Sequence, residues 1–280
     1  MIVKRRVQKA FVYLFVSLIG ILMLYPVLWL LSSSLKPEAL IFSQQGLWPK
    51  EFTLENYAKG WYVIKDLSFG TFFKNSLFLS SINVIANLIS CSMVAYAFAR
   101  LQFPLKKLWF VCMLGTLMLP VHVTLVPQYA IFHYLDWIDT FLPLTVPKFF
   151  ATDAFFIFLM VQFIRGIPRD LDESAIMDGC GIFRIYLRII LPLATPVLIT
   201  TAIFSFIWTW DDFFSQMLYL NTTSNYTVTL GLKLFLDSQG QSAWGPMFAM
   251  SILSILPITI IFFLFQKYIV EGIATTGIKG

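Results

Sequence analysis

Residues 10–35 read AFVYLFVSLIGILMLYPVLWLLSSSL, a stretch without a single charged side chain. As an α-helix it would extend about 39 Å, more than the roughly 30 Å hydrocarbon core of a bilayer. Further charge-free runs cover residues 75–99, 108–135, 189–210 and 238–266. The chain as a whole is 58% hydrophobic and 12% charged, which is too apolar for an ordinary soluble domain. The sequence therefore predicts an all-α polytopic membrane protein.

A sixth run, residues 149–165, is shorter and carries Asp153 near its start. We count it because the terminal tails and the charged loops fall on consistent sides of the membrane only when it spans. We therefore predict one transmembrane domain, residues 10–268, between tails at 1–9 and 269–280. The six predicted spans are 10–34, 73–99, 108–134, 149–165, 190–213 and 245–267.

The distribution of basic residues predicts which side each loop occupies. Cytoplasmic loops carry an excess of Lys and Arg. Six spans with an inward amino terminus place both tails and residues 168–192 in the cytoplasm. These basic residues follow membrane topology and form no stripe with aromatic rings, so nucleic-acid binding is not expected. The predicted inside holds every arginine and most of the basic residues: Lys4, Arg5, Arg6, Lys9, Arg100, Lys106, Lys107, Arg165, Arg169, Arg184, Arg188, Lys267 and Lys279.

Residues 168–192, PRDLDESAIMDGCGIFRIYLRIILP, form a charged block between apolar runs. Asp170 and Glu173 have nearly the spacing of a capping box, which predicts a helix start. Gly179 and Gly181 offer positions where a left-handed backbone costs little, so the helix should end there. The residues that follow have helical apolar spacing and a basic face. The block predicts a helix, a hinge and a second helix forming a docking surface; an ordinary polar loop is the alternative.

The same block resembles the EAA loop of ATP-binding-cassette (ABC) importer permeases, the segment that contacts the ATPase subunit. The match consists of Glu173, Ala175, Asp178, Gly179, Leu191 and Pro192, with Ser174 in place of the usual alanine. The resemblance implies a coupling loop at 168–192. Its expected ATPase-coupling residues are Glu173, Ser174, Ala175, Asp178, Gly179, Arg184 and Pro192.

Further landmarks resemble the second permease of maltose-type carbohydrate importers. They are Asn56-Tyr57 after Leu54-Glu55, Asn75-Ser76-Leu77, Ala95 to Arg100, Trp210 to Phe213, and Gly277 to Gly280. One departure is the acidic pair Asp211 and Asp212, where the family usually has Asn and then Glu. The resemblance covers nearly the whole chain and implies the type I ABC importer fold.

The resemblance also implies a function and a set of partners. The chain would be a permease subunit that moves a sugar or oligosaccharide across a bacterial or archaeal cytoplasmic membrane by alternating access. Its expected partners are a second homologous permease, two ABC ATPase subunits and an extracytoplasmic solute-binding protein. ATP and Mg would be bound by the partner ATPase.

The chain itself shows no motif for nucleotide hydrolysis or other catalysis. Residues 272–277 have the glycine spacing of a phosphate loop, but Ile278 stands where that motif needs lysine. Zinc-protease, serine-hydrolase and paired-cysteine motifs are missing from the sequence, and its two histidines lack metal-ligand spacing. We expect a transport subunit without enzymatic activity, cofactor or metal.

Acidic residues inside apolar runs are candidates for the translocation path. A charged side chain at mid-bilayer costs on the order of 3 kcal/mol and normally faces a cavity or a partner. Asp153, Trp210, Asp211, Asp212 and Phe213 are the expected substrate-pathway residues. The alternatives are an outer headgroup position for Asp153 and an interfacial helix end for Trp210, Asp211 and Asp212. A secondary transporter or channel would explain the spans equally well, but would leave the charged block without a role.

Overall fold

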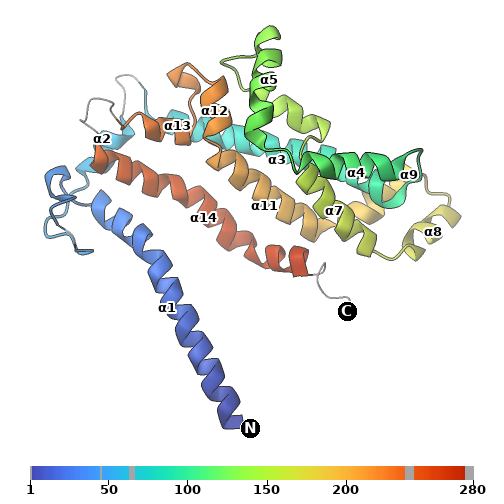
Figure 1. Ribbon diagram of the computed structural model, residues 1–280, viewed down its shortest axis with the longest axis horizontal. Coiled ribbons are helices and arrows are strands. Elements are labelled where there is room, and N and C mark those ends of the chain that lie inside the picture. The colour runs from blue at the N-terminus through green and yellow to red at the C-terminus, as the bar shows by residue number, and fades with distance from the viewer. Residues whose placement is uncertain (1, 45, 63–66, 237–242, 275–280) are drawn as a thin grey trace. The chain divides into compact units, whose positions relative to one another are not determined.

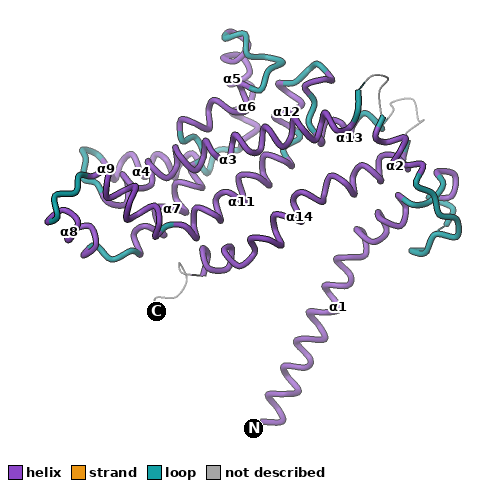
Figure 2. Tube along the Cα trace, turned by 180° about the vertical axis from the view of Figure 1, so that it is seen from behind, coloured by secondary structure: helices purple, strands orange, loops and turns teal. Residues whose placement is uncertain are grey.

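The computed structural model describes residues 2–44, 46–62, 67–236 and 243–274. Every regular element in these ranges is helical, and they contain no β-strand (Figure 1). Figure 2 distinguishes the helices from the loops that connect them. The predicted all-α class is confirmed.

Residue contacts divide the chain into two compact units: residues 1–70 with 232–256, and residues 71–231 with 257–280. In the first unit, Asn56 donates hydrogen bonds from Nδ2 to the carbonyl oxygens of Ser34 (2.9 Å) and Lys36 (2.8 Å). The Tyr57 hydroxyl lies 2.9 Å from Ser34 Oγ. Asn56 and Tyr57, a family landmark in the sequence, therefore fix the chain that leaves the first helix. The helices that begin in this unit are α1 (Ile2–Ser34), η1 (Glu38–Leu40), α2 (Glu55–Trp61), α3 (Phe69–Arg100) and α14 (Trp244–Ala274).

The second unit contains most of α3 and the helices that follow it. Its buried core includes Tyr96 of α3, Met160 of α7 and Ile190 of η3, packed in one apolar cluster. The helices of this unit are α4 (Lys106–Thr116), α5 (Val121–Tyr134), α6 (Leu142–Thr145), η2 (Val146–Phe150), α7 (Ala154–Gly166), α8 (Asp170–Met177), α9 (Ile182–Ile185), η3 (Tyr186–Ile190), α10 (Leu191–Leu193), α11 (Thr195–Asp211), α12 (Phe214–Tyr219), η4 (Thr223–Asn225) and α13 (Val228–Lys233), which ends in the first unit.

Four helical segments in the described residues are long and apolar enough to cross a membrane: Phe11–Ser34, Phe69–Arg100, Leu142–Gly166 and Trp244–Tyr268. A fifth candidate is the pair Ile182–Leu193 and Thr195–Asp211, which meet at a bend of 77°. Pro192 and Pro196 flank that bend. Since proline lacks a backbone N–H, the helical hydrogen-bond ladder cannot continue unbroken through this region.

The predicted third span, residues 108–134, is not one continuous helix. Its residues fall into α4 and α5, separated at 117–120, and Pro120 is the N-cap of α5. A proline disfavours helical geometry in the residue before it, which explains the break. The number of six spans therefore stays a prediction. The predicted carboxyl-terminal tail begins inside α14, and its last six residues, with the landmark Gly277 to Gly280, lie outside the described residues.

Asn75 and Ser76, another family landmark, hold a distant loop against α3. Asn75 donates from Nδ2 to the carbonyl oxygens of Ser224 and Tyr226, each at 2.8 Å. Ser76 Oγ accepts the backbone N–H of Val228 at 2.9 Å. The landmark thus has a structural role at the start of α13.

Candidate functional site

The elbow, defined as residues 168–194, contains α8, α9, η3 and α10. Figure 1 labels α8 and α9. Helix α8 begins at Asp170, and its N-cap is Arg169, without a side-chain capping hydrogen bond. The predicted capping box between Asp170 and Glu173 is therefore wrong. The first turn is instead acidic through Asp170, Asp172 and Glu173, and negative charge there is favoured by the helix dipole.

The hinge of the elbow is a Schellman turn at Gly179. The Gly179 N–H donates to the Ile176 carbonyl and the Cys180 N–H to the Ala175 carbonyl, each at 2.9 Å. Gly179 has φ of +77°, a value that side chains disfavour. Gly181 is extended, with φ −75° and ψ 162°, so the predicted left-handed role belongs to Gly179 alone.

Three side chains of α3 attach this elbow to the rest of the unit. Arg100 Nε lies 3.0 Å from Asp172 Oδ2, and Arg100 Nη2 donates to the Ile167 carbonyl at 2.7 Å. The Tyr96 hydroxyl donates to the Ile182 carbonyl at 3.2 Å, and Ser92 Oγ lies 2.7 Å from the Tyr186 hydroxyl. Both sides of the Gly179 hinge are therefore tied to one long helix.

The expected coupling residues differ in what they contact. Ala175 is buried in the same apolar cluster as Tyr96 and Ile185, which explains why a small residue stands there. The others are exposed: Glu173, Ser174, Asp178, Gly179, Arg184 and Pro192. Large apolar side chains are exposed beside them, namely Ile176, Met177, Ile182 and Phe183, with Met177 at 87%.

The second site is a cavity of about 630 Å³ in the second unit. Pockets of about 300–1,000 Å³ are typical of small-molecule sites. Three expected pathway residues, Asp153, Asp211 and Asp212, line it. Its other polar lining residues are Asn83, Asn87, Thr124, Gln128, Lys148, Thr152, Ser205, Thr209, Ser215 and Gln216.

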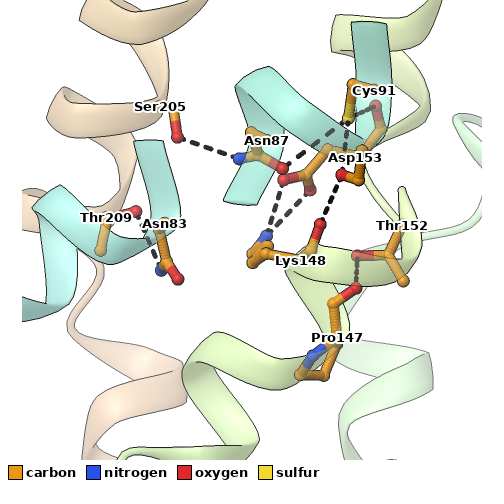
Figure 3. Close-up of polar contacts among 10 residues, drawn as sticks. Asn83, Asn87, Cys91, Pro147, Lys148, Thr152, Asp153, Ser205 and Thr209 are labelled. Atoms are coloured by element: carbon orange, nitrogen blue, oxygen red, sulfur yellow. Dashed lines mark hydrogen bonds and ion pairs between the residues drawn. The ribbon is translucent and has the colours of Figure 1, made fainter. Parts of the chain in front are cut away.

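An ion pair stands in the cavity wall where η2 meets α7. Lys148 Nζ lies 2.9 Å and 3.0 Å from the two carboxylate oxygens of Asp153 (Figure 3). Ser90 Oγ of α3 donates to the Lys148 carbonyl at 2.7 Å. The positive charge of Lys148 is thereby placed next to Asp153.

Amide side chains join α3 to α11 beside that ion pair. Asn87 Nδ2 donates to Ser205 Oγ at 2.9 Å, and Asn83 Nδ2 to Thr209 Oγ1 at 3.3 Å (Figure 3). A buried amide is costly unless it finds partners, so this polar seam specifies how the two helices align.

The helical period determines which aromatic rings of α11 reach the cavity. Trp208 lines it and stacks on Phe156, with ring centroids 5.0 Å apart. Trp210 points elsewhere, is 2% exposed and stacks on Phe206. Phe213 packs against the buried cluster around Tyr219 instead of lining the cavity. Trp210 and Phe213 thus do not line the cavity that the three aspartates line, whereas Trp208, which was not among the expected pathway residues, does.

The fold is that of a helical membrane protein with a cavity lined by polar side chains and a bent helical segment at residues 168–194. Residues 87–275 match the family described as binding-protein-dependent transport system inner membrane component. The chain belongs to this family and is a permease subunit of an ABC importer.

Individual relatives cover nearly the whole chain. The trehalose/maltose transport system permease protein MalG of Thermococcus litoralis is 32% identical, covering 94% of each chain. The arabinooligosaccharides transport system permease protein AraQ of Bacillus subtilis is 31% identical over 95% of this chain and 94% of its own.

A solved structure shares the fold. It is a bacterial ABC transporter involved in the import of the acidic polysaccharide alginate. The TM-score is 0.81 with 22% identity, covering 94% of this chain and 96% of the other.

Proposed function

We propose that this permease carries a sugar or oligosaccharide through the cavity of its second unit, paired with a second homologous permease. Relatives named for trehalose/maltose and arabinooligosaccharides support a carbohydrate substrate. The cavity supports it chemically, because carboxylates and amides can accept hydroxyl hydrogens while Trp208 offers an aromatic face. Asp153, Asp211 and Asp212 would contact the passing solute.

In this proposal the energy comes from two ABC ATPase subunits, one of which binds the elbow of this chain from the cytoplasm, where both tails also lie. ATP and Mg would be bound there, and an extracytoplasmic binding protein would deliver the solute. The single observation that supports this ATPase contact is the surface of the elbow. Its apolar side chains Ile176, Met177 and Phe183 are exposed, while Arg100 and Tyr96 hold its backbone against α3.

The ATPase contact can be tested by copurification of the coexpressed importer. Met177→Glu places a charge on the exposed apolar face, and burying an unpaired charge at an interface is unfavourable. We expect the ATPase recovered per permease to fall on the order of tenfold, or about 1.4 kcal/mol. Trp48→Glu changes an equally exposed residue, at 88%, outside the elbow and is the control. Equal ATPase recovery with both variants would contradict the docking assignment.

The solute path is tested by uptake into vesicles that contain the complete importer. Asp211→Ala and Asp212→Ala should each lower uptake while the ATPase subunits remain bound. Unchanged uptake and substrate dependence in either variant would remove that residue from the path. Uptake by the permease pair without the ATPase subunits would instead favour a secondary transporter or channel.

A further inference from the structure

The cavity has an unbalanced charge. One lysine and three aspartates line it, and the lysine, Lys148, is paired with Asp153. Among the residues that the structure describes, no Lys or Arg forms an ion pair with Asp211 or Asp212. Asp212 Oδ1 accepts the backbone N–H of Ser215 at 3.0 Å, a neutral donor. Two carboxylates of like charge therefore remain without a cation.

The oxygen of a buried amide in the cavity wall lacks a hydrogen-bond partner among the described residues. Asn83 lines the cavity and is 3% exposed. Its nitrogen is used by Thr209, whereas its Oδ1 has no hydrogen-bond partner in the described part of the chain. Figure 3 shows the amide nitrogen directed to Thr209 and the oxygen turned away from it. A buried acceptor left unsatisfied costs free energy, so a ligand that donates a hydrogen bond is favoured here.

An aromatic surface completes the wall. The stacked rings of Trp208 and Phe156, with an interplanar angle of 23°, both line the cavity. Ser205, Trp208 and Thr209 share the same face of α11 at helical spacing, and Asp212, the C-cap of α11, lines the cavity beside them. Acceptors for hydroxyl hydrogens and an aromatic face thus meet in one wall. The hydroxyl groups of a pyranose match the acceptors, and its C–H face matches the aromatic ring.

We propose that this cavity is a sugar subsite that accepts neutral and amino sugars and rejects uronic acids, with Asp211 and Asp212 as the selecting groups. The two carboxylates repel an anionic solute, whereas they attract an ammonium group. The inference rests on the proposed sugar import and adds a charge preference to it. The cavity would then select its solute by charge as well as by shape.

The charge of the cavity can be measured without knowing the natural solute. Gln128→Cys places a thiol at an exposed position in the cavity wall on α5. Tyr134→Cys places one on the same helix, 87% exposed at the parent residue, outside the cavity. Cys112→Ser and Cys180→Ser remove the accessible native thiols, and the buried Cys91 stays. The complete purified importer is treated with cationic trimethylammonium-ethyl and anionic sulfonato-ethyl methanethiosulfonate.

We expect the cationic-to-anionic rate ratio at residue 128 to exceed that at residue 134 on the order of tenfold at low salt. Adding Asp211→Asn and Asp212→Asn should bring the two ratios together. Equal ratios at residues 128 and 134 in the protein that keeps both aspartates would overturn the proposal. So would a ratio at residue 128 that is unchanged in the double amide variant, which combines Asp211→Asn with Asp212→Asn.

The sugar preference is read from protection of the residue 128 thiol by glucose, glucosamine or glucuronate at matched ionic strength. Glucose and glucosamine should slow labelling, and glucuronate should do so only in the double amide variant. Protection of the parent by glucuronate equal to that by glucose would overturn the preference, and protection by none would overturn the subsite. Uptake by the parent importer is measured separately, so failure of the proposed transport is distinguished from failure of the selectivity.

Discussion

The Arg100 guanidinium and the Asp172 carboxylate form an ion pair that joins the last residue of α3 to the first turn of α8, with Nε and Oδ2 3.0 Å apart. The two side chains are 5% and 17% exposed. A pair removed from water in this way is costly to break, because the remaining charge loses its partner without regaining its hydration. The pair therefore holds the elbow in place against α3.

Asp172→Asn tests this anchor. The change leaves Arg100 charged and largely buried, so local stability of the elbow should fall by about 3 kcal/mol or less. Hydrogen exchange of residues 170–180 in the assembled importer should become faster. Asp170→Asn is the matched control, since Asp170 is an exposed acid of the same helical turn. Unchanged exchange in Asp172→Asn would show that the ion pair does not hold α8.

Gly179 and Gly181 provide a second matched pair. A Cβ at either position would meet no atom within 4 Å, so only backbone conformation separates them. Gly179→Ala should cost about 1–2 kcal/mol because its φ is positive, and Gly179→Asn should cost less. Gly181→Ala should be nearly neutral. The measurement is hydrogen exchange at the end of α8, and equal effects at the two positions would refute the Schellman turn as the source of the requirement.

Asp139 makes one loop sensitive to acid. Its Oδ1 accepts the backbone N–H groups of Asn221 (2.9 Å) and Thr222 (2.8 Å), and Oδ2 accepts the Thr222 hydroxyl. Burial acts to raise the pKa of Asp139, but hydrogen bonds from Thr222, Asn221 and Asn225 outweigh it and lower that pKa from 3.8 to about 2. The stabilisation is therefore fully present above about pH 4 and is lost as the pH falls through 2.

The corresponding variant is Asp139→Asn, which tolerates the positive φ of 62° at this position. At neutral pH the backbone amide hydrogens of residues 220–226 should exchange about fivefold faster in this variant than in the parent, because charge-assisted hydrogen bonds are lost. Asp136→Asn, in the same loop and also at positive φ, should not. Acidification should bring the parent to the variant's behaviour only near pH 2, and convergence already at pH 5 would contradict the lowered pKa.

Gly231 is required by close packing. A Cβ there would lie 2.3 Å from Phe72 Cδ2, so Gly231→Ala should destabilise the importer by about 1–3 kcal/mol. Gly115→Ala, with no atom within 4 Å of the added carbon, should not. Thermal unfolding in detergent measures the difference. Phe72→Leu combined with Gly231→Ala should restore part of the loss, and a complete lack of rescue would point to another cause.

Local sequence patterns predicted much of this protein because membrane helices are encoded by uninterrupted apolar runs. The all-helical class followed from such runs, and the family followed from the block around Glu173 to Pro192. The break between α4 and α5 was missed, although Pro120 was a visible signal for it.

Contacts between residues far apart in the chain could not be predicted from the sequence. Arg100 and Asp172 are far apart in the chain, and nothing local indicates that they pair, although Arg100 ends a family landmark. The sequence also did not indicate which tryptophan of α11 lines the cavity. Trp208 and Trp210 are two residues apart and face different sides of α11, and an apolar run does not reveal which side meets the cavity.

The most direct test of the account is the number of ATP molecules hydrolysed per solute imported by the complete importer in vesicles. If the elbow transmits the movement of the ATPase subunits through Arg100 and Asp172, Asp172→Asn should raise this ratio severalfold while Asp170→Asn leaves it at the parent value. An unchanged ratio in Asp172→Asn, in a sample whose elbow exchanges hydrogen faster, would contradict the account.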